Sequence, residues 1–391
     1  MNEELNGEMP VLKKLVTAVA FTAVVFSSAP ITASADPVQV HGFLQARTIV
    51  ANTNYSERIH RFGFQFSQKL DDEFDWLVET YFHPSETDAP SRLYMESAFL
   101  NWHMSSKMPW DFTLRIGKGR NYTYGITPSY SSRRTSDYAL YSEAFTKLRV
   151  LGFQTFSNFV DNKVQLAVAL INPYRTSDGT AANPLSRPVP DFPLGLSIPI
   201  PICDRDNDIG AIVQRVALSG RLGYKDKVPV LGMLNVGASL YASQNGHDKT
   251  PAGVKMKNAV NRYGLDAEFK TDAGFMGQAQ FTLAQTPVDL DSLGVEGKTD
   301  KINETALNHN GGEVLVGYEQ PKYGLYARYS MLTYDNKFLD LNQIMLSAVY
   351  KIRPTIHLRL EGLINGEKED AAKKWNKVKN DVFFFETLFA L

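Results

Sequence analysis

The side chains most often used in covalent and metal chemistry are scattered along this 391-residue chain without the spacing that such chemistry requires. The histidines show no metal-ligand spacing, and the HExxH and GxSxG motifs are absent. The single cysteine, Cys203, excludes an internal disulfide, a CxxC redox pair and a CxxCH haem site. His247 beside Asp248 comes nearest to a catalytic pair. We therefore expect no enzyme, no cofactor and no metal site.

Electrostatic chemistry is better supported, because charged residues alternate with apolar ones in many segments. The arginines at such polar positions include Arg47, Arg61, Arg115, Arg328 and Arg359. The carboxylates at such positions are Asp75, Glu79, Glu96, Asp266, Glu268, Glu313, Glu319 and Glu361. Because the two signs nearly cancel, a surface lined by these side chains would discriminate only weakly between anions and cations. The chain as a whole has 41 Lys and Arg against 42 Asp and Glu, which gives no support to a nucleic-acid partner.

The elements that position these charges are predicted to be β-strands, because the alternation has a period of two residues. Ile344, Leu346 and Tyr350, for example, share one face, and Gln343 and Ser347 the other. The pattern recurs along the chain, and the sequence predicts about sixteen strands of roughly 10–13 residues, near the length of a tilted membrane strand. Two segments, 92–104 and 148–159, alternate poorly, and spacing alone assigns them as strands.

The connections distinguish a barrel from a soluble β-sandwich, whose strands also alternate. Short turns are predicted at 71–72, 105–110, 160–162, 225–229, 271–273, 320–322 and 351–355. Longer loops are predicted between them at 51–57, 84–91, 121–147, 173–210, 244–257, 287–312, 334–338 and 366–377. Strict alternation of short and long connections is typical of an outer-membrane barrel. We therefore predict an all-β fold, a transmembrane antiparallel barrel of about sixteen strands.

Aromatic residues on the apolar face gather next to the predicted short turns, as expected for a membrane-interface girdle. They are Phe74, Trp76, Phe112, Tyr224, Phe269, Phe275, Tyr318, Tyr323 and Tyr350. In the last segment, Phe383, Phe385 and Phe389 share a face with Leu391. This ending resembles the C-terminal assembly signal of outer-membrane proteins, with Leu391 in place of the usual final aromatic residue.

The first 35 residues have the features of a secretory signal. Lys13 and Lys14 precede an apolar run over 15–31, and Ala33-Ser34-Ala35 supplies a small-residue cleavage site. A membrane anchor is the alternative, but the run is shorter than the ~20 residues of a spanning helix. We expect residues 1–35 to be an export signal and residues 36–391 to form a single barrel domain.

Together, the export signal, the strand number and the long third loop resemble the general porins of the bacterial outer membrane. The resemblance implies that loop 121–147 folds into a pore and narrows it opposite a wall of arginines. This loop contains Arg133, Arg134, Asp137 and Glu143, and the arginine pair would tip the narrowing towards anions. Residues 115–153 also look like the same region of phosphate-selective porins, but the many lumen lysines of a phosphate pathway are not evident. The implied function is passive diffusion of small hydrophilic solutes.

The porin resemblance also implies a homotrimer in contact with outer-membrane lipid and lipopolysaccharide. A different reading is a structural sheath for an inserted partner, such as a multihaem cytochrome or a lipoprotein. The sheath would need an interior free of an inward loop, so a folded-in 121–147 would favour the channel. Loop 173–210 is rich in proline and ends near Asp204-x-Asp-x-Asp208, which lacks the Gly and Glu of a calcium loop. We expect an exposed acidic loop tip there.

Overall fold

The computed structural model contains sixteen β-strands, one 3₁₀ turn and one short helix. It describes residues 36–51, 54–83, 92–126, 135, 139–146, 149–172, 216–244, 259–287, 306–334, 340–367 and 381–390. The strands are β1 Gln39–Ala51, β2 Asn54–Lys69, β3 Phe74–His83, β4 Arg92–His103, β5 Asp111–Arg120, β6 Arg149–Phe159, β7 Val164–Ile171, β8 Ala217–Val228, β9 Gly232–Gln244, β10 Ala259–Lys270, β11 Phe275–Pro287, β12 Ala306–Glu319, β13 Tyr323–Tyr334, β14 Leu341–Arg353, β15 Ile356–Glu367 and β16 Val382–Ala390. The two helical elements are η1 Ser105–Lys107 and α2 Leu140–Phe145. No helix in these ranges is long and apolar enough to cross a membrane.

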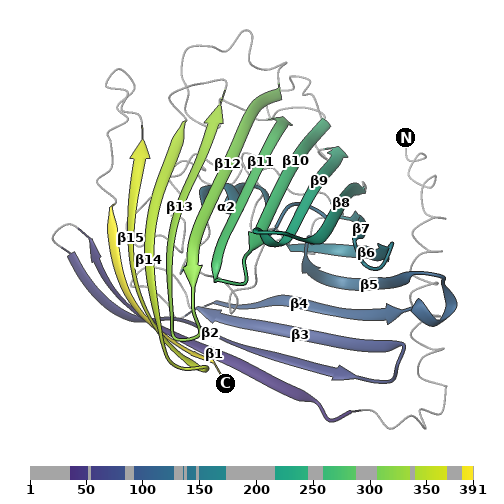
Figure 1. Ribbon diagram of the computed structural model, residues 1–391, viewed down its shortest axis with the longest axis horizontal. Helices are drawn as coiled ribbons and strands as arrows, with labels where there is room; N and C mark the ends of the chain where they lie inside the picture. The colour runs from purple at the N-terminus through teal and green to yellow at the C-terminus, as the bar shows by residue number, and fades with distance from the viewer. Residues whose placement is uncertain are drawn as a thin grey trace, which may run out of the picture.

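Each strand pairs antiparallel with its neighbours in sequence, and β1 pairs with β16 to close the sheet into a barrel (Figure 1). At this seam Leu44 lies opposite Phe389, and Arg47 opposite Glu386. Closure leaves no unpaired strand edge, which is how a β-sheet satisfies its backbone hydrogen bonds in lipid. The predicted sixteen-stranded antiparallel barrel is confirmed.

The two faces of the wall differ as the alternation predicts. Along β14, Leu346 and Tyr350 point outward and are more than half exposed, whereas Gln343 and Ser347 point inward and are buried. The outer surface is therefore apolar, and polar groups gather inside. Some inward positions are apolar nonetheless: Met276, Leu315, Tyr326 and Val349 form a cluster on the inner wall that the alternation did not predict.

Short connections lie at one end of the barrel, at 70–73, 104–110, 160–163, 229–231, 271–274, 320–322 and 354–355, and we call this the short-turn end. The predicted girdle is found there: the ring of Phe275 is tilted against that of Tyr318 with centroids 4.8 Å apart, and Phe74 stacks on Trp102 at 5.7 Å. At the opposite end, the prediction of a long loop at 51–57 is wrong. Residues 54–57 belong to β2 and pair with β1, so only two residues join these strands.

A β-bulge explains why segment 92–104 alternates poorly. Glu79 pairs with Ser97 and Thr80 with Met95, so Glu96 is an extra residue on β4. Met95 faces outward, while Glu96 and Ser97 both turn inward. A bulge shifts the inside–outside order by one residue and breaks the period of two. In β6 the strand is regular, but the inward position beside Arg115 is occupied by the apolar Phe156.

Ion pairs join consecutive hairpins around the short-turn end. We call this set the turn-side belt; its pairs are Lys107–Glu73, Lys163–Asp226, Lys227–Asp272, Lys270–Glu319 and Lys351–Glu319, with N–O distances of 2.7, 2.9, 3.1, 2.9 and 3.3 Å. In each pair the lysine and the carboxylate come from neighbouring hairpins. Most of these side chains are partly exposed, so each pair alone contributes about 1 kcal/mol or less.

Candidate functional site

The segment that follows β5, described at 121–126, 135 and 139–146, crosses the interior of the barrel, and we call it the crossing segment. Its first part is held to the inner wall by hydrogen bonds to successive strands. Asn121 Nδ2 donates to Ser219 Oγ on β8 at 3.2 Å, and the Gly125 amide donates to Ser239 Oγ on β9 at 3.1 Å. The Ile126 amide then donates to Gln280 Oε1 on β11 at 2.7 Å, and Gln280 Nε2 donates back to the Ile126 carbonyl.

The segment then reaches the far wall, where α2 packs against β12, β13 and β14 (Figure 1). Ser142 Oγ donates to Glu313 Oε2 on β12 at 2.9 Å, and the Tyr141 amide donates to Ser330 Oγ on β13 at 2.9 Å. Because β5 and β13 lie eight strands apart in a ring of sixteen, the segment spans the interior from one side to the other. A local sequence pattern could not have located these contacts.

Two tyrosines anchor the segment from its two halves to one wall residue. Tyr124 Oη lies 3.0 Å and Tyr141 Oη 2.9 Å from Thr282 Oγ1 on β11. Both side chains are fully buried. Burial removes water from the phenols, which raises the pKa of Tyr124 to about 12 and the pKa of Tyr141 well above its ordinary value. A tyrosine is already neutral at physiological pH, and the raised pKa values keep both hydroxyls neutral to higher pH.

Glycine makes room for the helix on the far wall. The ring of Phe145 lies against Gly311 of β12, where even a Cβ atom would overlap the ring. Nearby, Arg328 on β13 donates from Nη1 to Thr135 Oγ1 at 2.8 Å and from Nη2 to Gln343 Oε1 at 3.2 Å. The predicted site residue Arg328 thus lies on the inner wall and binds the crossing segment.

Two more of the predicted arginines meet at the barrel seam. Arg47 Nη2 lies 3.0 Å from Glu386 Oε2, and Arg359 Nη1 lies 2.6 Å from Glu386 Oε1. Gln45 donates to the same carboxylate, and the ring of Phe384 lies 4.6 Å from the Arg47 guanidinium carbon. Strands β1, β15 and β16 are therefore joined on the inside by one carboxylate shared between two guanidinium groups. The alternation around Phe385 could have placed Glu386 inside, but it was not among the predicted residues.

Other inward arginines are distributed around the wall. Arg61 is buried on β2, opposite Gln45. Arg120 is the last residue of β5, and its Nη2 lies 3.3 Å from Glu96 Oε1. The sequence analysis did not identify Arg120 as a site residue. Its partner is the bulge residue of β4, so no regular pattern could have paired them. Arg115 lies on the inner face of β5, close to the short-turn end.

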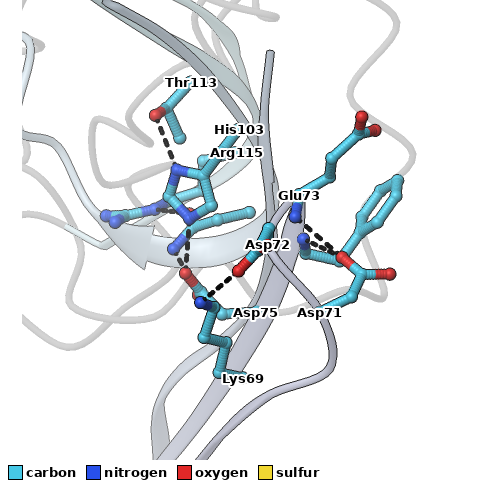
Figure 2. Close-up of polar contacts among 10 residues, drawn as sticks. Lys69, Asp71, Asp72, Glu73, Asp75, His103, Thr113 and Arg115 are labelled. Carbon is cyan, nitrogen blue, oxygen red and sulfur yellow. Dashed lines mark hydrogen bonds and ion pairs between the residues drawn. The ribbon is translucent and has the colours of Figure 1, made fainter. Parts of the chain in front are cut away.

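Arg115 belongs to a hydrogen-bonded chain that runs along the short-turn end (Figure 2). Arg115 Nε donates to Asn101 Oδ1 at 2.9 Å, and Asn101 Nδ2 donates to Asp75 Oδ1 at 2.7 Å. The other oxygen of Asp75 lies 2.6 Å from His103 Nε2, and His103 Nδ1 lies 3.0 Å from Thr113 Oγ1. The chain fixes the position of Arg115 through an uncharged amide rather than through a direct ion pair.

Several predicted features lie outside the described residues. These are the export signal 1–35, the site residues Arg133, Arg134 and Asp137, the 173–210 loop and Cys203. Glu143 lies within α2, but its side chain is not among those described. Within the described ranges, no three His, Cys, Asp or Glu side chains come together as a metal site would require.

Solved structures share this architecture at low sequence identity. The outer membrane channel DcaP of Acinetobacter baumannii matches with a TM-score of 0.62 and 12% identity, over 92% of this chain and 98% of DcaP. OmpF of Salmonella typhi, solved with daunomycin, matches with a TM-score of 0.56 and 11% identity, over 90% and 97% of the two chains. An anion-selective porin from Comamonas acidovorans matches with a TM-score of 0.50 and 10% identity, over 92% and 100%.

At these identities the likeness establishes the fold, and the expected resemblance to the porin barrel is confirmed at that level. No protein-family model matches the sequence, and no curated protein matches it either.

Proposed function

We propose that this protein is a channel of the bacterial outer membrane through which small hydrophilic solutes diffuse passively. One observation carries the proposal: a closed wall that is apolar outside and polar inside surrounds a segment that crosses the interior. Charged groups are costly against lipid, but they are tolerated on a water-filled lumen. The chain would be exported by residues 1–35 and carry out no chemical reaction.

In this proposal, segment 121–147 narrows the lumen. It is held at Ile126 by β11 and at Tyr141 by β13, so Arg133, Arg134 and Asp137 belong to the stretch between two anchor points. Thr135, next to Arg134 in the chain, is bound by the wall residue Arg328. Arg133 and Arg134 would then add two positive charges to a stretch that is bound to the wall by Arg328. Most other inward arginines have carboxylate partners, so the proposed anion preference is weak.

Planar-bilayer recording tests the channel directly. Purified protein should give discrete conductance steps, and a salt gradient should give a reversal potential displaced slightly towards that of the anion. Replacing Arg133 and Arg134 together by Glu should move the reversal potential towards that of the cation. The matched control is Arg353→Glu on the exposed short-turn end of β14, which should leave the reversal potential unchanged. Pure, folded protein without conductance steps would refute the channel; equal shifts in both variants would refute the narrowing.

The crossing segment also favours a channel over a sheath, because it occupies the space that an inserted cytochrome or lipoprotein would need. We further propose a homotrimer, surrounded by outer-membrane lipid and lipopolysaccharide. Light scattering of the protein in detergent should give three times the chain mass after correction for bound detergent. A monomer mass would contradict the trimer and leave the channel proposal intact.

A further inference from the structure

A pocket of about 310 Å³ opens on the inner wall between β5 and β8, near the short-turn end. It is separate from the contacts that hold the crossing segment to the far wall. The side chains that give it its character are Arg115, Tyr122, Phe156, Asn158, Gln165 and Arg221. Ala167 forms part of its lining, and this short side chain leaves the pocket open between the longer ones.

Arg115 provides a positive charge that is fixed in position. Its guanidinium carbon lies 3.8 Å from the ring centroid of Phe99, and its Nε donates a hydrogen bond to Asn101 Oδ1. No carboxylate within the described ranges forms an ion pair with Arg115, and Nη1 and Nη2 make no hydrogen bond there. Stacking and an amide therefore hold the side chain in place, while its two terminal nitrogens remain available as donors to a ligand.

The second arginine of the pocket is different, because its charge is already compensated. Arg221 Nε donates to Asp266 Oδ2 at 2.9 Å, and Nη2 lies 2.5 Å from Asp266 Oδ1. Glycine at position 237 leaves room for this guanidinium, since a Cβ there would overlap it. The net charge that the pocket presents to a ligand therefore comes from Arg115.

The other walls of the pocket are flat or amide-bearing. The rings of Tyr122 and Phe156 lie 5.3 and 5.1 Å from the Arg115 guanidinium carbon. The side-chain amides of Asn158 and Gln165 make no hydrogen bond to any other residue that the structure describes. A ligand that suits this pocket carries a carboxylate, which pairs with two parallel N–H donors of a guanidinium. It also carries a planar body, which packs against aromatic rings.

We propose that this pocket is a binding subsite for aromatic carboxylates. The proposal deepens the proposed function, on which it rests, by naming a class of solute that would pause at this point of the channel. The carboxylate would accept hydrogen bonds from Arg115 Nη1 and Nη2, and the aromatic ring would lie against Tyr122 and Phe156. Asn158 and Gln165 would bind polar substituents. Inorganic phosphate and short aliphatic acids lack the planar body.

Benzoate is a suitable probe, with cyclohexanecarboxylate as a non-planar acid of the same charge and similar size. Calorimetric titration of the folded full chain in detergent should show saturable benzoate binding, several-fold tighter than cyclohexanecarboxylate. Arg115→Gln should weaken benzoate binding by about tenfold or more, because it removes charge-assisted hydrogen bonds. Arg115→Lys keeps the charge but loses the paired donors, so it should also weaken binding. The matched control is Lys225→Gln, which removes a charge from an exposed residue of β8 beyond Arg221 and should change affinity by less than about twofold.

The outcomes separate this proposal from the channel itself. Equal losses of benzoate affinity in Arg115→Gln and Lys225→Gln would mean that only the overall positive potential of the lumen attracts the ligand. Equal affinity for the two acids would mean that the pocket does not recognise a planar ring. Either result, or no saturable binding, overturns the subsite. Normal conductance without benzoate binding would refute the subsite alone; binding without conductance would refute the channel alone. If Arg115→Gln fails to fold, the double variant Asn158→Ala/Gln165→Ala should weaken binding of 4-hydroxybenzoate by about threefold or more, and unchanged affinity would overturn the proposal.

Discussion

Replacing Glu386 by Gln should destabilise the barrel far more than the same substitution elsewhere on the inner wall. Glu386 is the carboxylate shared by Arg47 and Arg359 at the seam where β16 meets β1. The Glu386 and Arg47 side chains are 0% exposed, so water cannot replace the lost partner. Gln has the same shape as Glu, so the packing is kept and only the charge is removed.

The expected loss of unfolding free energy follows from the burial of this ion pair. Removing one partner of a buried ion pair costs about 3–5 kcal/mol, because the remaining charge stays desolvated and uncompensated. Glu268 on β10 provides the matched control. It accepts one hydrogen bond from Asn235 at 3.2 Å and forms no ion pair in the described part of the chain. Glu268→Gln should therefore cost about 1 kcal/mol or less. The difference of about 2 kcal/mol or more corresponds to roughly a thirtyfold change or more in the unfolding equilibrium constant.

The assay is urea unfolding of the protein folded into lipid vesicles, followed by tryptophan fluorescence and by the mobility shift of unheated samples on gels. The double variant Arg47→Gln/Glu386→Gln removes one of the stranded guanidiniums, so it should be less destabilised than the sum of the two single variants. If Glu386→Gln and Glu268→Gln have the same unfolding free energy, the shared carboxylate does not hold the seam, and this reasoning is wrong.

Three further predictions follow from other parts of the barrel. Gly117→Ala should cost about 1–3 kcal/mol in urea unfolding, because Gly117 has a φ of +135° and its Cβ would lie 2.3 Å from the Ala98 carbonyl; Gly220→Ala, with no atom closer than 3.6 Å, should be tolerated, and equal costs would contradict this. The double variant Tyr141→Phe/Ser142→Ala removes two side-chain hydrogen bonds of α2 and should make single-channel current noisier; current as quiet as in the unmodified protein would show that these contacts do not hold the segment. The hydrogen bond from Lys107 lowers the pKa of Glu73, so this pair stabilises the fold above the ordinary carboxylate pKa, and the contribution is lost as pH falls through the lowered value. Lys107→Met should therefore reduce the urea midpoint at neutral pH but not in strong acid, and a pH-independent effect would refute the assignment.

The strands could be predicted from sequence because the rule that governs them is local. In β14, the exposed Leu346 and the buried Ser347 follow directly from the period of two. The same rule fails at Glu96, because one inserted residue reverses which positions face inward and which face outward. The types of the neighbouring residues do not indicate a bulge. It also fails to mark Met276 and Tyr326, apolar side chains that cover one another on the inner wall.

The interior contacts are beyond local reasoning for a different reason. Tyr124 and Tyr141 meet Thr282 across more than a hundred residues, and Ser142 meets Glu313 in the same way. Only the closed ring determines which strand faces the crossing segment. The resemblance to porins supplied an inward loop, but not its anchor points. Arg47 and Arg359 were predicted to be inside, yet their shared partner Glu386 requires the seam between the first and last strands.

The turn-side belt has a consequence for how the sheet is put together. Its charges match only between hairpins that are neighbours in the correct alignment; Glu319, for example, receives Lys270 from one side and Lys351 from the other. A slip of two residues preserves the apolar outside, but it displaces each lysine by about 7 Å from its carboxylate. The belt therefore disfavours a register error that the apolar outer surface alone would tolerate. It favours the correct alignment of each hairpin with its neighbours. Reversing the charge of Glu319 should slow insertion into vesicles more than reversing Asp72, whose only ion-pair partner in the described chain is Lys69 of its own hairpin.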